Sequence, residues 1–270
     1  MSEMLQRFSN IHRAIQQNNQ GYTNQSLRYE NRLLVSEIAD LIHIDFYASP
    51  FESFFEELLL LLCEPQIAPR LQSLYFHYND EGANGTQHWN FKSLVDSDAV
   101  FPNLMSLSIQ QYDGTAHNHP IIGYGNMFSY EESGTLAKWM DKAPNLRSLT
   151  APSAPNREFF LRDSAPLERL NLQAGYDTQQ FILNFSQSRC FPNLRIFEYR
   201  DFDETYSDDY PQNCTPLEQF YTLFQSAAFD PIQSFVWHNP IFSTEELAQL
   251  KALRPQLSFK VTHISYTWVK

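Results

Sequence analysis

The chain has 270 residues, of which 43% are hydrophobic and 15% aromatic, with a formal net charge of −12 and a pI of about 5.0. This composition supplies enough apolar side chains for a packed core and excludes an intrinsically disordered chain. The net negative charge argues against nucleic-acid binding, which usually requires a basic surface, and it attracts basic partners instead.

The first residues and the cysteines predict where the protein resides. Residues 1–7 lack the apolar core of an export signal, and the longest apolar run, residues 58–63, is too short to cross a bilayer. The three cysteines form no CxxC pair, which favours buried, reduced thiols. We therefore expect a cytoplasmic protein that has no membrane partner.

Residues 1–37 are expected to form an N-terminal cap segment. Its first part, residues 1–30, is rich in Gln, Asn and Ser, and one helix is predicted over residues 3–17. The repeated motif described next begins after this segment.

A short motif recurs through residues 38–262: Pro, one spacer, Leu, two spacers, Leu, one spacer and an apolar residue. Residues 69–76, 102–109 and 144–151 carry it in full. The alternation at its end is the period of a strand with one buried face, and Pro suits the entry to such a strand. The first apolar anchors of the copies are Leu41, Leu71, Leu104, Leu146, Leu167, Leu194, Ile232 and Leu257.

Helices are predicted between these strands, because capping residues follow several copies of the motif. Four segments combine a cap residue with Glu or Gln three positions later, which satisfies two backbone N–H groups. These capping boxes start at Ser49, Asp177, Thr215 and Ser243. The predicted helices span residues 50–64, 135–142, 178–188, 216–228 and 244–253, with weaker signals at 87–97 and 156–163.

Strands that alternate with helices predict an α/β fold with a parallel sheet. One such strand cannot bury its apolar face alone, so the copies are expected to stack as a solenoid. Because a helix is about 10 Å wide and strands lie about 4.8 Å apart, the sheet should curve, with its concave face open and the helices on the convex side. Residues 263–270 are expected to form a C-terminal capping strand, in a β-branched and aromatic stretch that starts at Ser258.

The motif resembles that of leucine-rich repeat proteins over residues 38–262, with about seven or eight irregular copies. The resemblance implies a solenoid with a concave binding surface. One position departs from the family pattern, which places Asn eight residues after the first Leu to tie adjacent turns. Here that position is Asn in one copy, so a divergent member with irregular turns is expected; the residues are Ser49, Asn79, Tyr112, Ala154, Gly175, Phe202 and Pro240.

Motifs of enzymes are absent from the sequence, including GxSxG, GxxxxGK[ST], HExxH and GxGxxG. His117 and His119 form a His-Asn-His pair, but no further ligand has suggestive spacing, so a polar loop is favoured over a metal site. We expect neither a metal nor a cofactor.

The segment 111–133 is predicted to be a long loop with a function of its own. It holds Tyr112, Tyr124 and Tyr130 together with three glycines. Loops above roughly 12–15 residues in compact domains are commonly functional or disordered, and aromatic side chains favour an ordered contact surface. A loop that folds on its own aromatic side chains is the equal alternative.

The segment 201–210 is a second candidate for partner binding. It places carboxylates between aromatic residues directly after a predicted strand, which suits a basic partner. The alternative is a solvated acidic turn, since charge runs usually face water. Its binding candidates are Asp203, Glu204, Asp208 and Asp209.

The concave face of the predicted sheet is the third candidate. Residues that alternate with the buried anchors should point outward there, and this set is polar with a few aromatic side chains. For any single residue, ordinary exposed strand surface is the simpler reading. The binding candidates are Tyr47, Tyr75, His77, Gln110, Glu198, Arg200 and His238.

These patterns together predict a non-enzymatic scaffold that binds another protein through the concave face and the adjoining loops. The acidic charge favours a basic partner, in the manner of leucine-rich repeat inhibitors of basic ribonucleases, and hence an inhibitor or immunity role. An adaptor or substrate-receptor subunit of a larger complex is one alternative. An enzyme with an unrecognised site is the other.

Overall fold

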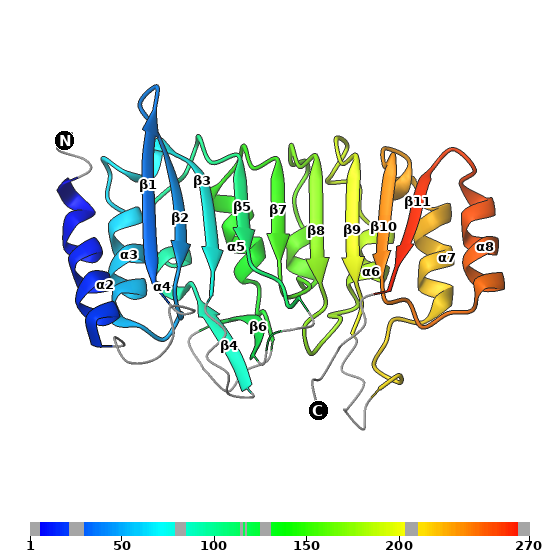
Figure 1. Cartoon of the computed structure of the whole chain (residues 1–270). Helices are drawn as coiled ribbons and strands as arrows, with labels where there is room; N and C mark the ends of the chain where they lie inside the picture. The colour runs from blue at the N-terminus through cyan, green and yellow to red at the C-terminus, as the bar shows by residue number, and fades with distance from the viewer. Residues whose placement is uncertain are drawn as a thin grey trace.

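The main feature of the computed structural model is a sheet of nine strands (Figure 1), and the residues described are 6–21, 30–78, 85–113, 116, 118–124, 131–202 and 210–263. Neighbouring strands from β2 to β11 are parallel, whereas β1 pairs antiparallel with β2. The predicted α/β class with a mostly parallel sheet is thus confirmed. In spatial order the strands are β1 (Arg32–Ile38), β2 (Leu41–Tyr47), β3 (Leu71–His77), β5 (Ser106–Ile109), β7 (Ser148–Ala151), β8 (Arg169–Gln173), β9 (Ile196–Arg200), β10 (Ser234–His238) and β11 (Ser258–Thr262).

One face of the sheet carries the core. The second apolar anchors of the predicted motif lie in register as one row of seven residues, each at most 1% exposed. The buried face predicted for each copy is therefore confirmed from β2 to β10. The row consists of Ile44, Leu74, Leu107, Leu149, Leu170, Phe197 and Phe235.

Helices cover this buried face. Figure 1 shows α3 to α6 behind the strands, α7 and α8 continuing the layer at the C-terminal end, and α2 at the N-terminal end. The opposite face carries no helix in the part of the chain that the structure describes, and we call it the open face. The helices are α2 (Ser9–Gly21), α3 (Ser53–Leu62), α4 (Lys92–Val95), α5 (Thr135–Lys142), α6 (Phe181–Ser186), α7 (Leu217–Gln225) and α8 (Thr244–Leu253), with 3₁₀ turns η2 (Ala68–Arg70), η3 (Arg157–Phe160) and η4 (Ala227–Phe229).

The predicted helix bounds are confirmed for α5 and α8, but α3, α6 and α7 start one to three residues later than predicted. Three of the predicted capping boxes are wrong, because each cap side chain bonds elsewhere. The Thr215 hydroxyl donates to Asp201 Oδ1 over 3.1 Å. Asp177 Oδ1 accepts from the backbone N–H of Gln179 over 2.7 Å, which closes a turn before α6. The Ser49 hydroxyl likewise accepts from the backbone within a turn that precedes α3.

The fourth capping box forms as predicted, at the start of α8. The Ser243 N–H donates to Glu246 Oε2 over 2.8 Å, and the Glu246 N–H donates to Ser243 Oγ over 3.3 Å. We expect Ser243→Ala to lower the free energy of unfolding by about 1 kcal/mol, since it removes one cap acceptor. Urea denaturation measures this change. Thr244→Ala, at the next hydroxyl, is the control, and an equal loss in both variants would contradict the role of the cap.

The N-terminal segment differs from its prediction. The helix predicted over residues 3–17 is confirmed over most of its described part, but α2 spans Ser9–Gly21 and so extends four residues further. The strand β1 was not predicted, because it is antiparallel and lies outside the repeated motif. Ala39 and Asp40, with φ of 51° and 66°, form its two-residue turn into β2. Residues 1–37 are therefore joined to the main sheet through β1.

Two further strands lie outside the nine-stranded sheet. β4 (Gly85–Asn90) and β6 (Asn118–Gly123) form a separate parallel pair. β4 occupies the start of the weak helix predicted over 87–97, of which only the short α4 is helical, and β6 lies inside the segment predicted as a loop over 111–133. Each was missed because its partner is distant in the sequence, and pairing rather than local propensity decides its conformation. At the other end, β11 confirms a terminal strand from Ser258, while most of the capping strand predicted over 263–270 lies outside the described residues.

Candidate functional site

The open face presents a row of side chains that align across the sheet. The row is polar overall, with charged groups near both ends, an aromatic ring at the β3 position and small hydroxyl groups in the centre. A surface of this kind suits contacts with a protein better than it suits an enclosed small molecule. The row consists of Asp45, Tyr75, Ser108, Thr150, Asn171, Glu198, Val236 and Lys260.

Predicted site residues come together on β2 and β3, at one end of this row. The His77 ring stacks on Tyr75 with centroids 6.5 Å apart, and His77 Nε2 lies 3.7 Å from Asp45 Oδ1. On the same face, the guanidinium of Arg32 lies 4.6 Å from the ring centre of Tyr47. Tyr75 is 37% exposed. Two aromatic rings and an acid–imidazole pair are thus open to a partner here.

A second acid–imidazole pair lies toward the other end, on β9 and β10. Glu198 Oε2 lies 3.7 Å from His238 Nε2 and accepts from Asn171 Nδ2 over 3.4 Å. The neighbouring imidazole of His238 lowers the pKa of Glu198 despite its partial burial. The other imidazole nitrogen, His238 Nδ1, lies 2.6 Å from the Thr262 hydroxyl. Glu198 and His238 therefore form a preorganised polar patch.

Three of the predicted binding residues use their polar groups within the fold. Gln110 Oε1 accepts from the Tyr78 N–H over 3.1 Å. Arg200 is only 7% exposed, and its Nη1 donates to the Tyr112 carbonyl over 2.7 Å. The Tyr112 N–H donates to Gln173 Oε1 over 2.8 Å. These contacts tie the chain leaving β5 to the ends of β3, β8 and β9.

The aromatic residues of segment 111–133 that the structure describes pack on the chain itself. The ring of His119 in β6 lies between those of Tyr112 and Tyr176, with centroids 4.9 Å away on each side. His119 is buried. This arrangement favours the alternative in which the segment folds on its own aromatic side chains. Tyr130 and His117 lie outside the described residues.

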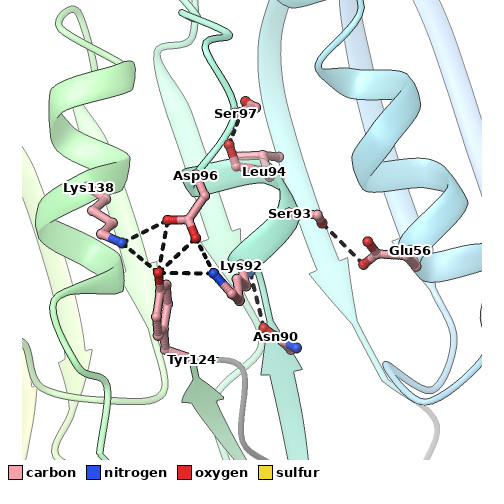
Figure 2. Close-up of polar contacts among 9 residues, drawn as sticks. All are labelled: Glu56, Asn90, Lys92, Ser93, Leu94, Asp96, Ser97, Tyr124 and Lys138. Atoms are coloured by element: carbon pink, nitrogen blue, oxygen red, sulfur yellow. Dashed lines mark hydrogen bonds and ion pairs between the residues drawn. The ribbon is translucent and has the colours of Figure 1, made fainter.

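Tyr124, which follows β6, belongs to a polar cluster on the helical side. Figure 2 shows Asp96 between Lys92, Lys138 and the Tyr124 hydroxyl. Lys138 Nζ donates to Asp96 Oδ1 over 2.8 Å, and the Tyr124 hydroxyl donates to Oδ2 over 2.7 Å. The hydrogen bonds from Lys138, Lys92 and Tyr124 hold the pKa of Asp96 well below its usual range. Both lysines also lie over the Tyr124 ring, so this residue fastens β6 to α4 and α5.

The acidic segment 201–210 is described only at its two ends. Asp201 is buried and accepts from the Thr215 N–H over 2.9 Å and from the Phe202 N–H over 2.8 Å. Burial raises its pKa to about 6 although these hydrogen bonds favour the anion. Asp201 thus joins the end of β9 to the start of α7. The predicted binding residues Asp203, Glu204, Asp208 and Asp209 lie outside the described residues.

A groove that the sequence did not indicate borders the open face at its N-terminal end. Its volume is about 940 Å³, and it is lined by α2, β1 and the first strands of the open face. Leu34 and Ile38 of β1 are 56% and 62% exposed beside it. The apolar run at residues 33–35 pointed to burial rather than to a surface, and the antiparallel hairpin that exposes these side chains has no strong turn signal.

Within the described ranges, no helix combines the length and the apolar character that crossing a bilayer requires. Those ranges also contain no group of three or more His, Cys, Asp or Glu residues placed to hold a metal ion. Comparison with known proteins finds no matching family model, no similar curated protein and no similar solved structure.

Proposed function

We propose that this protein is a non-enzymatic binding protein that holds another protein on its open face. The observation that carries the proposal is the one-sided cover of the sheet: helices bury one face, while the other presents aromatic and charged side chains in register. Rigid strands fix these groups before binding, which lowers the entropy cost of association. Tyr75 and Tyr47 are the expected anchors, because aromatic residues dominate binding energy at interfaces.

We also propose that the chain is an irregular leucine-rich repeat solenoid, with the open face as its concave surface. The in-register apolar anchors and the strand order, which follows the chain order, support this proposal. In such a solenoid each copy contacts its neighbours, and the sheet supplies an extended surface for a partner.

A basic protein is the proposed partner, and inhibition or immunity is the role that this implies. The net charge of −12 supports long-range attraction of a basic surface. The described open face itself is mixed in charge, since Asp45 and Glu198 are accompanied by Arg169 and Lys260. Raised salt is therefore expected to slow association with the partner more than it speeds dissociation.

Quantitative affinity capture from the native extract tests the open face. We expect one stoichiometric partner, and we expect Tyr75→Ala to weaken its binding about 30-fold, as loss of an aromatic anchor does. Glu198→Ala should also weaken binding, by about fivefold or more, because it removes one charged contact. Leu60→Ala is the matched control, since Leu60 is 55% exposed on α3 in the helical layer. A partner that is lost with Leu60→Ala and kept by both open-face variants would refute the proposal.

A further inference from the structure

Among the described residues, the strand β1 ends the nine-stranded sheet and pairs with β2 on one side only. Successive residues of an antiparallel strand direct their backbone N–H and C=O groups to opposite edges. The backbone of Asn31, one residue before β1, shows which residues face outward. The Asn19 side chain in α2 donates to the Asn31 carbonyl over 2.7 Å and accepts from its N–H over 3.0 Å. With a period of two, the backbone groups of Leu33 and Val35 face this same outer edge.

The contact between Asn19 and Asn31 reproduces the pairing of a neighbouring strand. One carboxamide occupies the position that the next chain's peptide group would take, with one donated and one accepted hydrogen bond. The fold thus already supplies a substitute strand partner at the start of this edge. Beyond it, along β1, the groove of about 940 Å³ opens between this edge and α2.

The walls of the groove favour an extended, largely uncharged chain. Leu34 and Ile38 lie four residues apart on the open-face side of β1, and both leave apolar surface exposed. Among the lining residues, the side chains that carry a full charge are Arg13 on the α2 wall and Asp45 on the sheet wall. Their opposite signs disfavour a strongly basic or acidic occupant. An extended segment also satisfies the outward backbone groups of an edge strand, which a helix cannot do.

We propose that β1 accepts an extended segment of a partner polypeptide as an additional strand, in the groove between β1 and α2. This inference rests on the proposed function and specifies how part of the partner is held. Backbone hydrogen bonds to β1 supply affinity, and apolar side chains at alternate positions of the segment contact Leu34 and Ile38. One acidic side chain at an intervening position, which faces α2, complements Arg13, and one basic side chain on the open-face side complements Asp45.

Synthetic peptides test the strand addition without the natural partner. The probes are fluorescent nine-residue peptides that alternate Val or Ile with Thr, with one Glu in place of a Thr and one Lys in place of a Val or Ile, measured by fluorescence anisotropy. We expect binding to the full chain, at least a tenfold loss in Leu34→Glu/Ile38→Glu, and no change in the matched control Leu60→Glu. Methylation of alternate peptide N–H groups should abolish binding in one register and leave it unchanged in the other.

Several results would overturn the inference. These are the absence of binding by all peptides, equal binding by the double variant, and equal effects of methylation in both registers. A dimer of the free protein that Leu34→Glu dissolves, seen by light scattering, would make a second copy of this chain the occupant and refute a partner segment. If the captured partner depends on Glu198 but not on Leu34 or Ile38, the proposed function holds and strand addition fails.

Discussion

Phe197→Ala is expected to lower the free energy of unfolding by about 3–5 kcal/mol, the usual cost of truncating a buried aromatic residue. Phe197 is fully buried in the row of second anchors, between Leu170 and Phe235. Its ring stacks on Phe235 of β10, with centroids 5.1 Å apart and planes at 15°, and meets the edge of Phe185 of α6 at 5.5 Å. Truncation therefore opens a cavity between two strands and the helix that covers them.

Urea denaturation followed by far-ultraviolet circular dichroism measures this loss. Ile196→Ala is the matched control, because Ile196 precedes Phe197 on β9 but is only half-buried and points to the opposite face. We expect the control to lose less than about half as much, since it removes a smaller, partly hydrated side chain. A loss in Phe197→Ala no larger than in Ile196→Ala would show that the row of second anchors is not a main source of stability.

The parts of the fold that could be predicted from the sequence are those that local periodicity determines. The alternating anchors placed each strand of the nine-stranded sheet from β2 to β10 and assigned its buried face. Parallel neighbours with short links then followed from the alternation of strands with helices. Residues such as Leu107 and Leu149 lie next to each other because both occupy the same place in the motif.

The parts that were missed depend on distant partners. β4 and β6 pair with each other although 27 residues separate Asn90 from Asn118, and β1 joins the sheet as an antiparallel hairpin. The cap residue Thr215 was misassigned for a similar reason. Its hydroxyl is taken by Asp201, whose position no local pattern reveals. Short-range signals cannot reveal a hydrogen-bond partner that the fold brings from elsewhere in the chain.

The residues of the candidate site likewise differ in whether local periodicity or a distant segment determines their position. Tyr75, His77, Glu198 and His238 reach the open face because strand alternation alone puts them there. Arg200 has the same alternation, but its guanidinium turns to the Tyr112 carbonyl and is buried. The segment after β5 makes this contact, and its path is not encoded in the repeat. Alternation therefore predicts the face of the sheet on which a residue lies, while the neighbouring segments decide whether its side chain is exposed to a partner.

Stability is expected to fall as pH rises from about 4.5 to about 7, through the buried carboxyl group of Glu132. This residue is 1% exposed, and burial raises its pKa from 4.5 to about 7. Its oxygens accept from the N–H groups of Gly134 and Leu136 at the start of α5, which offsets burial only in part. The folded state thus holds a proton that the unfolded state has already released.

The sign follows from this difference in bound protons. Below pH 4.5 both states are protonated, and the contribution to stability is fully present. Between 4.5 and 7 the unfolded state binds fewer protons than the folded state, so the free energy of unfolding falls with pH. At about 1.4 kcal/mol per pH unit, the loss across this window is about 3 kcal/mol. Asp201, whose pKa burial raises to about 6, adds a loss of the same sign.

Glu132→Gln removes the ionisable group and keeps an oxygen that accepts from the start of α5. Urea denaturation at several pH values should show the variant gaining about 3 kcal/mol relative to the original chain between pH 4.5 and 8. Glu57→Gln, which changes an exposed carboxyl group of α3, is the matched control and should leave the pH profile unchanged. Parallel profiles for Glu132→Gln and the original chain would mean that water or a local rearrangement solvates the Glu132 carboxylate. In that case Glu132 would serve as an ordinary ionised cap of α5, and the pH dependence would have to come from other groups.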